Sequence, residues 1–349
     1  MIAETTVDLA RTLDFTDKFL GWMRGRGAVL IVTHDHPDPD SLAAAMALKH
    51  LITVKTGQPA TVAFGGMIGR GENRVMVRKL EIDLVPLNTL DLDRFPVVCM
   101  VDSQPGTGNN SYPFDRRVDL VIDHHPLRES CRNVRWVDVL EEYGATATML
   151  FEYLEAQKVS YGTKLATILY YAIKSETQDL GRDWIRADRR AYLHLLPLVN
   201  NSILFDILHA EVPRAYFAHF SHAIRNAMIY NEVLVFNLFE IDTPDMVAEL
   251  ADFLLRVDEV KIVLGMGHYK DGVALSFRTL RNDLNSGEIM QTLVAGFGTG
   301  GGHDMIAGGQ IPDTPADRDT LVRLEQTLTQ RLLQTLGCYP VPGLPLVAE

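Results

Sequence analysis

Three short apolar runs in the first third of the sequence are each followed, within two positions, by aspartate or histidine. The runs cover residues 28–32, 97–101 and 118–122, the last of which is interrupted by Asp119. Apolar segments of this length, in a chain where helical stretches precede and follow them, predict buried parallel strands. In open sheets of this type, binding and catalysis take place beyond the carboxyl ends of the strands. The pattern therefore predicts an α/β fold with a polar site at one edge of its sheet.

Helical periodicity surrounds these predicted strands. Helices are expected at residues 5–25, 42–51, 145–157 and 164–174, the second of them capped by Ser41. Further strands are expected at 233–241, 260–266 and 273–277, the last two joined by a turn at Lys270-Asp271-Gly272. We therefore expect an N-terminal domain (1–192) with a mainly parallel sheet and helices on both faces. A helical connector (193–229) and a smaller mixed α/β C-terminal domain (230–349) would follow it.

Composition narrows the classes of function. The chain has 349 residues, 47% hydrophobic and 22% charged, as expected for a globular protein of two domains. Its net charge of −12 argues against broad contact with duplex nucleic acid or a membrane, but allows a small anion held by metal ions. The three cysteines favour neither a disulfide framework nor a thiolate zinc site. Few, widely spaced cysteines suit a reducing compartment, and the N-terminus shows no secretory pattern. Together these two observations predict a cytoplasmic protein.

The residues at the three strand ends have the chemistry of metal ligands. The first end carries His34, Asp38 and Asp40, the second Asp102, and the third Asp123-His124-His125. Any one of these aspartates, taken alone, is more often a turn or helix-capping residue. Three such ends in one sheet are harder to obtain by chance. A mixed imidazole and carboxylate set of this size suits a pair of Mn²⁺ or similar ions, an arrangement used for displacement at phosphorus.

The glycine-rich segment at residues 296–303 is a candidate phosphate-binding segment. Successive glycines let backbone N–H groups approach an anion closely, because no Cβ intervenes. The alternative is a plain flexible loop. Arg278 and Arg281 follow a predicted strand and are candidate guanidinium clamps for an anion, the alternative being a solvated surface pair.

These motifs, in this order, resemble those of the DHH phosphoesterases that carry a DHH-associated C-terminal domain. The resemblance rests on His34-Asp35-His36-Pro37-Asp38-Pro39-Asp40, Asp102, Asp123-His124-His125 and Gly300-Gly301-Gly302-His303, and it covers nearly the whole chain. It implies a catalytic domain at 1–192 and a substrate-binding domain at 230–349. It also implies that Gly300, Gly301, Gly302 and His303 bind substrate.

The resemblance further implies a role for each residue of the metal site. One ion would be held by His34 and Asp38 and the other by Asp40 and His124, with Asp102 bridging the two. Asp123 would orient an imidazole, His125 would contact the substrate phosphate, and a water activated by the ions would attack phosphorus.

A fourth segment departs from the family pattern. The family usually places a metal-binding Asp before a Thr there, whereas this chain has Glu176 before Thr177. Glutamate can still bind a metal ion, so Glu176 is kept as an expected ligand. Its extra methylene moves the carboxylate by about 1 Å, which matters where the geometry is tight.

The expected function is hydrolysis of short oligonucleotides (nanoRNA), dinucleotides or nucleoside bisphosphates such as pAp. The expected cofactors are two divalent cations, with Mn²⁺ favoured over Mg²⁺ or Co²⁺. The expected partners are short single-stranded RNA or DNA and no membrane, and the family suggests a homodimer. The alternatives are a manganese-type pyrophosphatase or polyphosphatase, and a nucleotide-binding sensor whose metal centre is impaired at Glu176.

Overall fold

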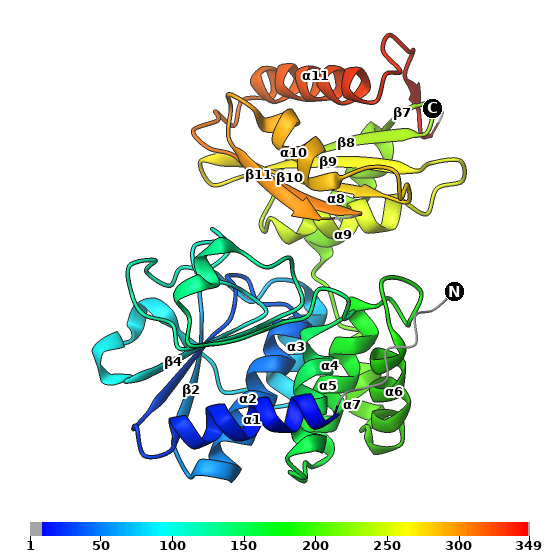
Figure 1. The fold of residues 1–349 in the computed structure, drawn as a ribbon. Coiled ribbons are helices and arrows are strands. Elements are labelled where there is room, and N and C mark those ends of the chain that lie inside the picture. The colour runs from blue at the N-terminus through cyan, green and yellow to red at the C-terminus, as the bar shows by residue number, and fades with distance from the viewer. Residues whose placement is uncertain (1–8, 304, 348–349) are drawn as a thin grey trace. The chain divides into compact units, whose positions relative to one another are not determined.

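Six parallel strands form the sheet of the first half of the chain, in the order β3-β2-β1-β4-β5-β6. They are β1 (Val29–Val32), β2 (Ala60–Phe64), β3 (Val85–Pro86), β4 (Val97–Val101), β5 (Leu120–Asp123) and β6 (Trp136–Val139). The structure is a computed structural model that describes residues 9–303 and 305–347. It divides into two units, Met1–Ala210 and Glu211–Glu349 (Figure 1). The predicted parallel sheet is confirmed, and the carboxyl ends of its strands share one edge.

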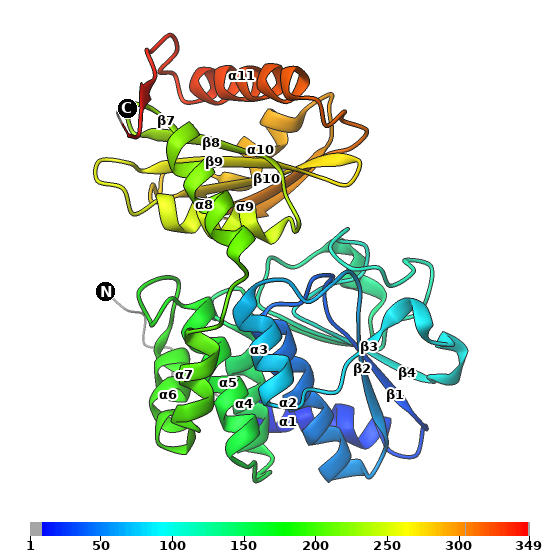
Figure 2. The ribbon, with the colours of Figure 1, turned by 180° about the vertical axis from the view of Figure 1, so that it is seen from behind.

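Seven α-helices accompany this sheet within the described residues: α1 (Leu9–Met23), α2 (Pro39–Thr56), α3 (Gly71–Lys79), α4 (Thr146–Ala156), α5 (Thr163–Glu176), α6 (Arg186–Leu195) and α7 (Asn201–Leu208). Val29 and Ile31 share a buried cluster with these helices, whose packing is visible from behind in Figure 2. Leu30 and Val32 point to the other face. There they share a cluster with Leu87, from the 3₁₀ turn η1 (Leu87–Thr89), and with Cys131, from η3 (Glu129–Asn133).

Helix α2 begins earlier than the sequence suggests. Ser41 was expected to cap it, but the N-cap is Asp38, whose Oδ1 accepts a hydrogen bond from the Ser41 N–H at 2.9 Å. Pro39 explains the difference, because proline has no N–H to satisfy and its fixed φ suits the first helical position. As a result, Asp40 lies in the first turn of α2 and not in the preceding loop.

The second unit contains a seven-stranded mixed sheet in the order β11-β12-β10-β9-β8-β7-β13. Its strands are β7 (Met228–Tyr230), β8 (Val233–Glu240), β9 (Ile262–Tyr269), β10 (Gly272–Thr279), β11 (Thr299–His303), β12 (Ile306–Ile311) and β13 (Leu344–Pro345). β8 and β9 are parallel, and the other neighbouring strands are antiparallel. The predicted hairpin at Lys270-Asp271 is confirmed, because Tyr269 pairs directly with Gly272.

Helices cover both faces of this second sheet. α8 (Arg214–Asn226) and α9 (Asp245–Leu254) share a buried cluster with one face, and α10 (Ser286–Val294) and α11 (Arg318–Thr335) share one with the other (Figure 1). The expected helical region at 193–229 contributes α7 to the first unit and α8 to the second.

Among the residues that the structure describes, no single helix combines the length and apolarity needed to cross a bilayer. One bent pair, Arg186–Leu198 with Asn201–Leu208, passes that test by length and composition together.

Candidate metal centre

The predicted site residues of the first unit follow strands that are neighbours in the sheet. β1 pairs with β4, and β4 pairs with β5, so the segments after these strands lie at one edge. They carry, in chain order, His34 to Asp40, then Asp102, then Asp123 to His125. Glu176 ends helix α5, which packs against the same core.

His34 presents one ring nitrogen to two carboxylates. Its Nδ1 donates to the carbonyl oxygen of Asp35 at 2.7 Å, which leaves Nε2 to face the site. Nε2 lies 3.5 Å from Asp38 Oδ1 and 3.6 Å from Asp102 Oδ2. A histidine whose other nitrogen is fixed by a carbonyl is the usual form of a metal-binding histidine.

His124 repeats this arrangement. Its Nδ1 donates to the carbonyl oxygen of Tyr143 at 2.9 Å. Its Nε2 lies 3.6 Å from Asp102 Oδ1 and 3.9 Å from Asp40 Oδ2. The two imidazoles therefore form two similar groups, each made with a different aspartate and both sharing Asp102.

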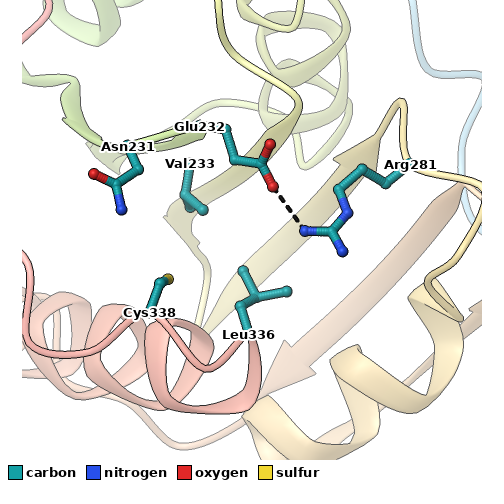
Figure 3. A pocket seen from close by; sticks show the side chains of 6 residues that line it. All are labelled: Asn231, Glu232, Val233, Arg281, Leu336 and Cys338. Atoms are coloured by element: carbon teal, nitrogen blue, oxygen red, sulfur yellow. Dashed lines mark hydrogen bonds and ion pairs between the residues drawn. The ribbon is translucent and has the colours of Figure 1, made fainter.

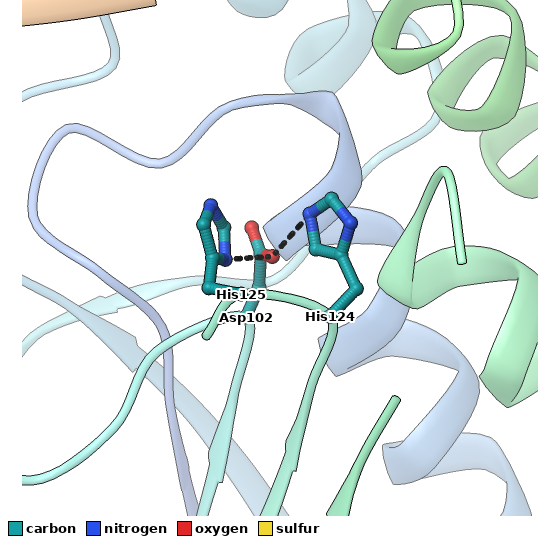
Figure 4. A group of neighbouring side chains, drawn as sticks. All are labelled: Asp102, His124 and His125. Atoms are coloured by element: carbon teal, nitrogen blue, oxygen red, sulfur yellow. Dashed lines mark ion pairs between the residues drawn. The ribbon is translucent and has the colours of Figure 1, made fainter. Parts of the chain in front are cut away.

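Asp102 stands at the centre of the cluster, and Figure 4 shows its carboxylate between the rings of His124 and His125. Each oxygen faces a different side: Oδ2 lies near His34, and Oδ1 lies near His124. The backbone of Asp102 is left-handed, with φ 54°, and Oδ1 also accepts a hydrogen bond from Thr146 Oγ1 at 3.0 Å. Only 2% of the residue is exposed, so its position is closely determined.

Asp40 is a candidate ligand and also accepts hydrogen bonds that stabilise the fold. Its Oδ2 accepts from the Thr146 N–H at 2.7 Å, and its Oδ1 accepts from the Ala147 N–H at 2.8 Å. These are donors at the N-terminus of α4, where backbone N–H groups lack partners within the helix. A carboxylate on α2 therefore caps α4.

Asp123 holds the imidazole of His125 by a hydrogen bond. Asp123 Oδ1 accepts from His125 Nδ1 at 2.9 Å, and Asp123 Oδ2 accepts from Gln104 Nε2 at 2.7 Å. Burial opposes the charged imidazole, but Asp123 and Asp102 outweigh burial and raise the pKa of His125 to about 9. Gln104 was not anticipated, and nothing in its sequence context distinguishes it from a surface glutamine.

The charges of the cluster fit divalent cations. Burial, together with the neighbouring carboxylates, raises the pKa of Asp40, of Asp102 and of Glu176, the last to about 7. The side chains therefore carry more negative charge than their surroundings stabilise, and a bound cation would relieve this excess. Oxygen-rich donors with two imidazoles suit Mn²⁺ and similar ions.

Two compact groups of potential ligand atoms are present among the described residues. One comprises His34, Asp38 and Asp102, and the other comprises Asp102, His124 and His125. Neither group includes Glu176. Its charge nevertheless contributes to raising the pKa of Asp40 and of His125, so its carboxylate lies near the cluster.

Asp188 orders the segment that orients His124, and sequence reasoning missed it. Its Oδ2 accepts from the Gly144 N–H at 3.0 Å, and its Oδ1 accepts from Thr148 Oγ1 at 2.6 Å. A Cβ at Gly144 would lie 2.4 Å from the carbonyl oxygen of Asp183, so only glycine fits there. Because the carbonyl of Tyr143 holds His124, Asp188 helps to position that imidazole.

The two candidate arginine clamps lie in the second unit and pair with carboxylates of that unit. Arg278 Nε lies 2.5 Å from Asp252 Oδ1, and the Arg278 side chain is buried. Arg281 Nη1 lies 2.7 Å from Glu232 Oε1, beside a pocket shown in Figure 3. Their assignment as substrate ligands stays a prediction.

The glycine run forms an edge strand and not an irregular loop. Gly300, Gly301 and Gly302 lie in β11, which pairs with β12. The side chain of His303 lies outside the described part of the structure. A Cβ at Gly302 would lie 2.2 Å from the carbonyl oxygen of Ile306, whereas one at Gly301 would meet nothing within 4 Å. Close strand pairing therefore requires glycine at 302 but not at 301.

Alanine substitutions at Gly301 and Gly302 should have different effects on the free energy of unfolding. Gly302→Ala is expected to lower the free energy of unfolding by about 1–3 kcal/mol, because the new methyl group overlaps backbone atoms. Gly301→Ala should change it by less than about 0.5 kcal/mol, since the added group meets open space. Chemical denaturation of both variants measures the difference, and equal losses would contradict it.

Sequence comparisons match both units to known domains. The DHH family N-terminal domain matches residues 28–173, and the DHHA1 domain matches residues 230–331. The chain is also 31% identical over 319 residues to an uncharacterized protein of Methanocaldococcus jannaschii, MJ1633. That match covers 89% of this chain, which spans 65% of the relative's length.

Solved structures share the fold. An exopolyphosphatase-related protein from Bacteroides fragilis aligns with a TM-score of 0.73 at 15% identity, covering 93% of this chain and 97% of the other. RecJ from Thermus thermophilus, in complex with Mn²⁺, aligns with a TM-score of 0.55 at 13% identity, covering 98% of this chain and 56% of the other.

Proposed function

Because this chain belongs to the DHH family, with a DHH N-terminal domain followed by a DHHA1 domain, we propose that it hydrolyses phosphoester bonds with the help of two divalent cations. The observation that carries the proposal is the position of Asp102, whose two oxygens each lie 3.6 Å from a different imidazole. A carboxylate shared in this way suits a pair of neighbouring cations. His34 and Asp38 would complete one cation site, and His124 and Asp40 the other.

The chain's own residues would orient the substrate in this reaction. When bound, the cations would polarise a phosphoryl group and lower the pKa of a coordinated water. Asp123 holds the His125 imidazole by its Nδ1 at 2.9 Å, which orients the ring to contact a phosphate oxygen. Glu176, at the end of α5, would add a carboxylate to the cation pair.

We propose short nucleotides as the substrate class: oligonucleotides of a few residues (nanoRNA), dinucleotides, or nucleoside bisphosphates such as pAp. The net charge of −12 supports this choice, because tight binding of a long polyanion needs an extended basic channel. Mn²⁺ is the proposed cofactor, since imidazole ligands shift preference away from Mg²⁺.

Product release from a substrate panel tests this proposal. The panel comprises pAp, di- to pentanucleotides, cyclic dinucleotides and pyrophosphate, each with Mn²⁺, with Mg²⁺, with Co²⁺, and after chelation. We expect nucleotide turnover that disappears with chelator and returns when Mn²⁺ is added back. Cleavage of pyrophosphate alone would replace the proposal with a pyrophosphatase. Nucleotide binding without turnover would replace it with a sensor.

A further inference from the structure

We propose that an arginine-lined pocket of the first unit binds the phosphate and base of one additional nucleotide of the substrate. The inference rests on the proposed function for its substrate class. The pocket has a volume of about 640 Å³, within the usual range for sites that enclose a small ligand. Its lining includes three arginines, Arg128, Arg132 and Arg135, and the apolar side chains of Leu127 and Val134.

The pocket is joined to the candidate metal centre by Gln104. The Arg128 N–H donates to Gln104 Oε1 at 2.7 Å, and Cys131 Sγ, which also lines the pocket, lies 3.3 Å from the same oxygen. The amide nitrogen of Gln104 donates to Asp123 Oδ2 at 2.7 Å. One side chain thus contacts both the wall of the pocket and the carboxylate that holds His125. The pocket begins two residues after His125, at Leu127.

The pocket has more arginine side chains than nearby carboxylates to pair with them. Arg132 pairs with Glu129 at 2.8 Å. Arg128 and Arg135, in contrast, form no ion pair with any residue that the structure describes. Two guanidinium groups are therefore available to an anion in a chain whose net charge is −12. Guanidinium groups bind phosphate oxygens through two parallel hydrogen bonds, which favours phosphate over a simple point charge.

A second group of side chains strengthens the field around Arg135. The Arg135 guanidinium lies 5.4 Å from the centroid of the Trp22 ring, and Arg26 and Arg117 lie 4.4 Å and 6.0 Å from the same ring. Arg117 pairs with Asp119, so the other two charges remain to attract an anion. Guanidinium groups on an indole ring keep their positive charge, so Arg26 adds to the positive field beside Arg135.

The apolar wall favours a nucleotide over inorganic phosphate. Leu127 is 55% exposed, and Val134 and Val137 are half-buried beside it. Apolar side chains next to guanidinium groups match a ligand that has a flat base at one end and a phosphate at the other. We therefore expect a nucleoside monophosphate to bind more tightly than phosphate alone.

Binding of AMP and of inorganic phosphate to the chelator-treated protein tests the pocket without catalysis. Isothermal titration calorimetry should give a Kd for AMP that rises about tenfold or more in the double variant Arg128→Ala/Arg135→Ala, because two charged hydrogen-bonding groups are lost. Arg94→Ala, which removes an exposed arginine elsewhere in the unit, is the matched control and should keep the wild-type Kd. An unchanged Kd in the double variant, tighter binding of phosphate than of AMP, or undetectable AMP binding to wild type would overturn the proposal.

Kinetics then locate the bound nucleotide relative to the scissile bond. In the double variant, the ratio of the KM for a trinucleotide to the KM for a dinucleotide should rise about tenfold, since only the longer substrate carries the additional phosphate. An unchanged ratio would show that the pocket is not part of the substrate path. If wild type hydrolyses no nucleotide, the proposed function fails, whereas the binding experiment still decides whether the pocket takes AMP.

Discussion

Replacing Asp102 with asparagine is expected to reduce turnover about 1000-fold, which corresponds to about 4 kcal/mol of transition-state stabilisation. Asp102 is the residue shared by both candidate ligand groups, with one oxygen 3.6 Å from His34 and the other 3.6 Å from His124. An amide offers one neutral oxygen in place of two charged ones, so it cannot serve two cations equally. Turnover of the best substrate with Mn²⁺, together with metal content after dialysis, measures the effect.

Asparagine is the informative substitution because it keeps the size and shape of the side chain while it removes the charge and one of the two acceptor oxygens. It tolerates the left-handed backbone at φ 54°, where alanine would be strained, and its oxygen can still accept from Thr146. Burial, and next the charge of Asp38, raise the pKa of Asp102. Such a group costs stability once the pH rises through its folded-state pKa. We therefore expect the metal-free variant to match or exceed the wild-type melting temperature at pH 8. Near wild-type turnover in a folded variant would refute the two-cation assignment.

Replacing Asp40 with alanine is expected to reduce both turnover and stability. Loss of a proposed ligand of one cation should reduce turnover at least about 100-fold. The same change leaves the Thr146 and Ala147 N–H groups without acceptors in a buried position, since Asp40 is 1% exposed. Losing such a cap costs about 1–2 kcal/mol of unfolding free energy.

A matched control separates the two effects of the Asp40 substitution. Asn200 caps α7 of the same unit by accepting from the Ile203 N–H at 3.1 Å. Asn200→Ala should cost a similar amount of stability, about 1 kcal/mol, and leave turnover intact. Denaturant titration and initial rates on both variants give the comparison. If Asn200→Ala lost as much turnover as Asp40→Ala, instability alone would explain the loss.

The sequence was most informative where an apolar run leads directly into polar residues. The strands at 29–32 and 97–101 were recognisable because parallel strands are buried on both faces and read as continuous apolar stretches, and the strand at 120–123 was recognisable from Leu120-Val121-Ile122 before Asp123. Their adjacency follows from the sheet order, which placed His34, Asp102 and His124 together. The ligand groups could therefore be anticipated from runs of four or five residues.

Features that depend on distant partners could not be anticipated. The strand Ala60–Phe64 was missed because its composition carries no strong apolar run. No strand was predicted at Gly300 to Gly302, since glycine is unfavourable in strands, but tight pairing with β12 leaves no room for a side chain at Gly302. Similarly, nothing near Asp188 in sequence reveals that it holds Gly144, which lies 44 residues earlier.

The parallel order of the first sheet has a consequence for how the chain folds. β1 is in the middle of the sheet, yet its neighbours β2 and β4 and the next strand β5 arise from three separate crossovers. His34 and Asp102 can approach each other only after β4 has docked on β1, and His124 joins them only once β5 has added to β4. Because closing such long loops costs entropy before any contact repays it, we expect the cluster to form late in folding. If the chain binds cations as proposed, we therefore expect them to bind after the sheet has assembled and not to nucleate this unit.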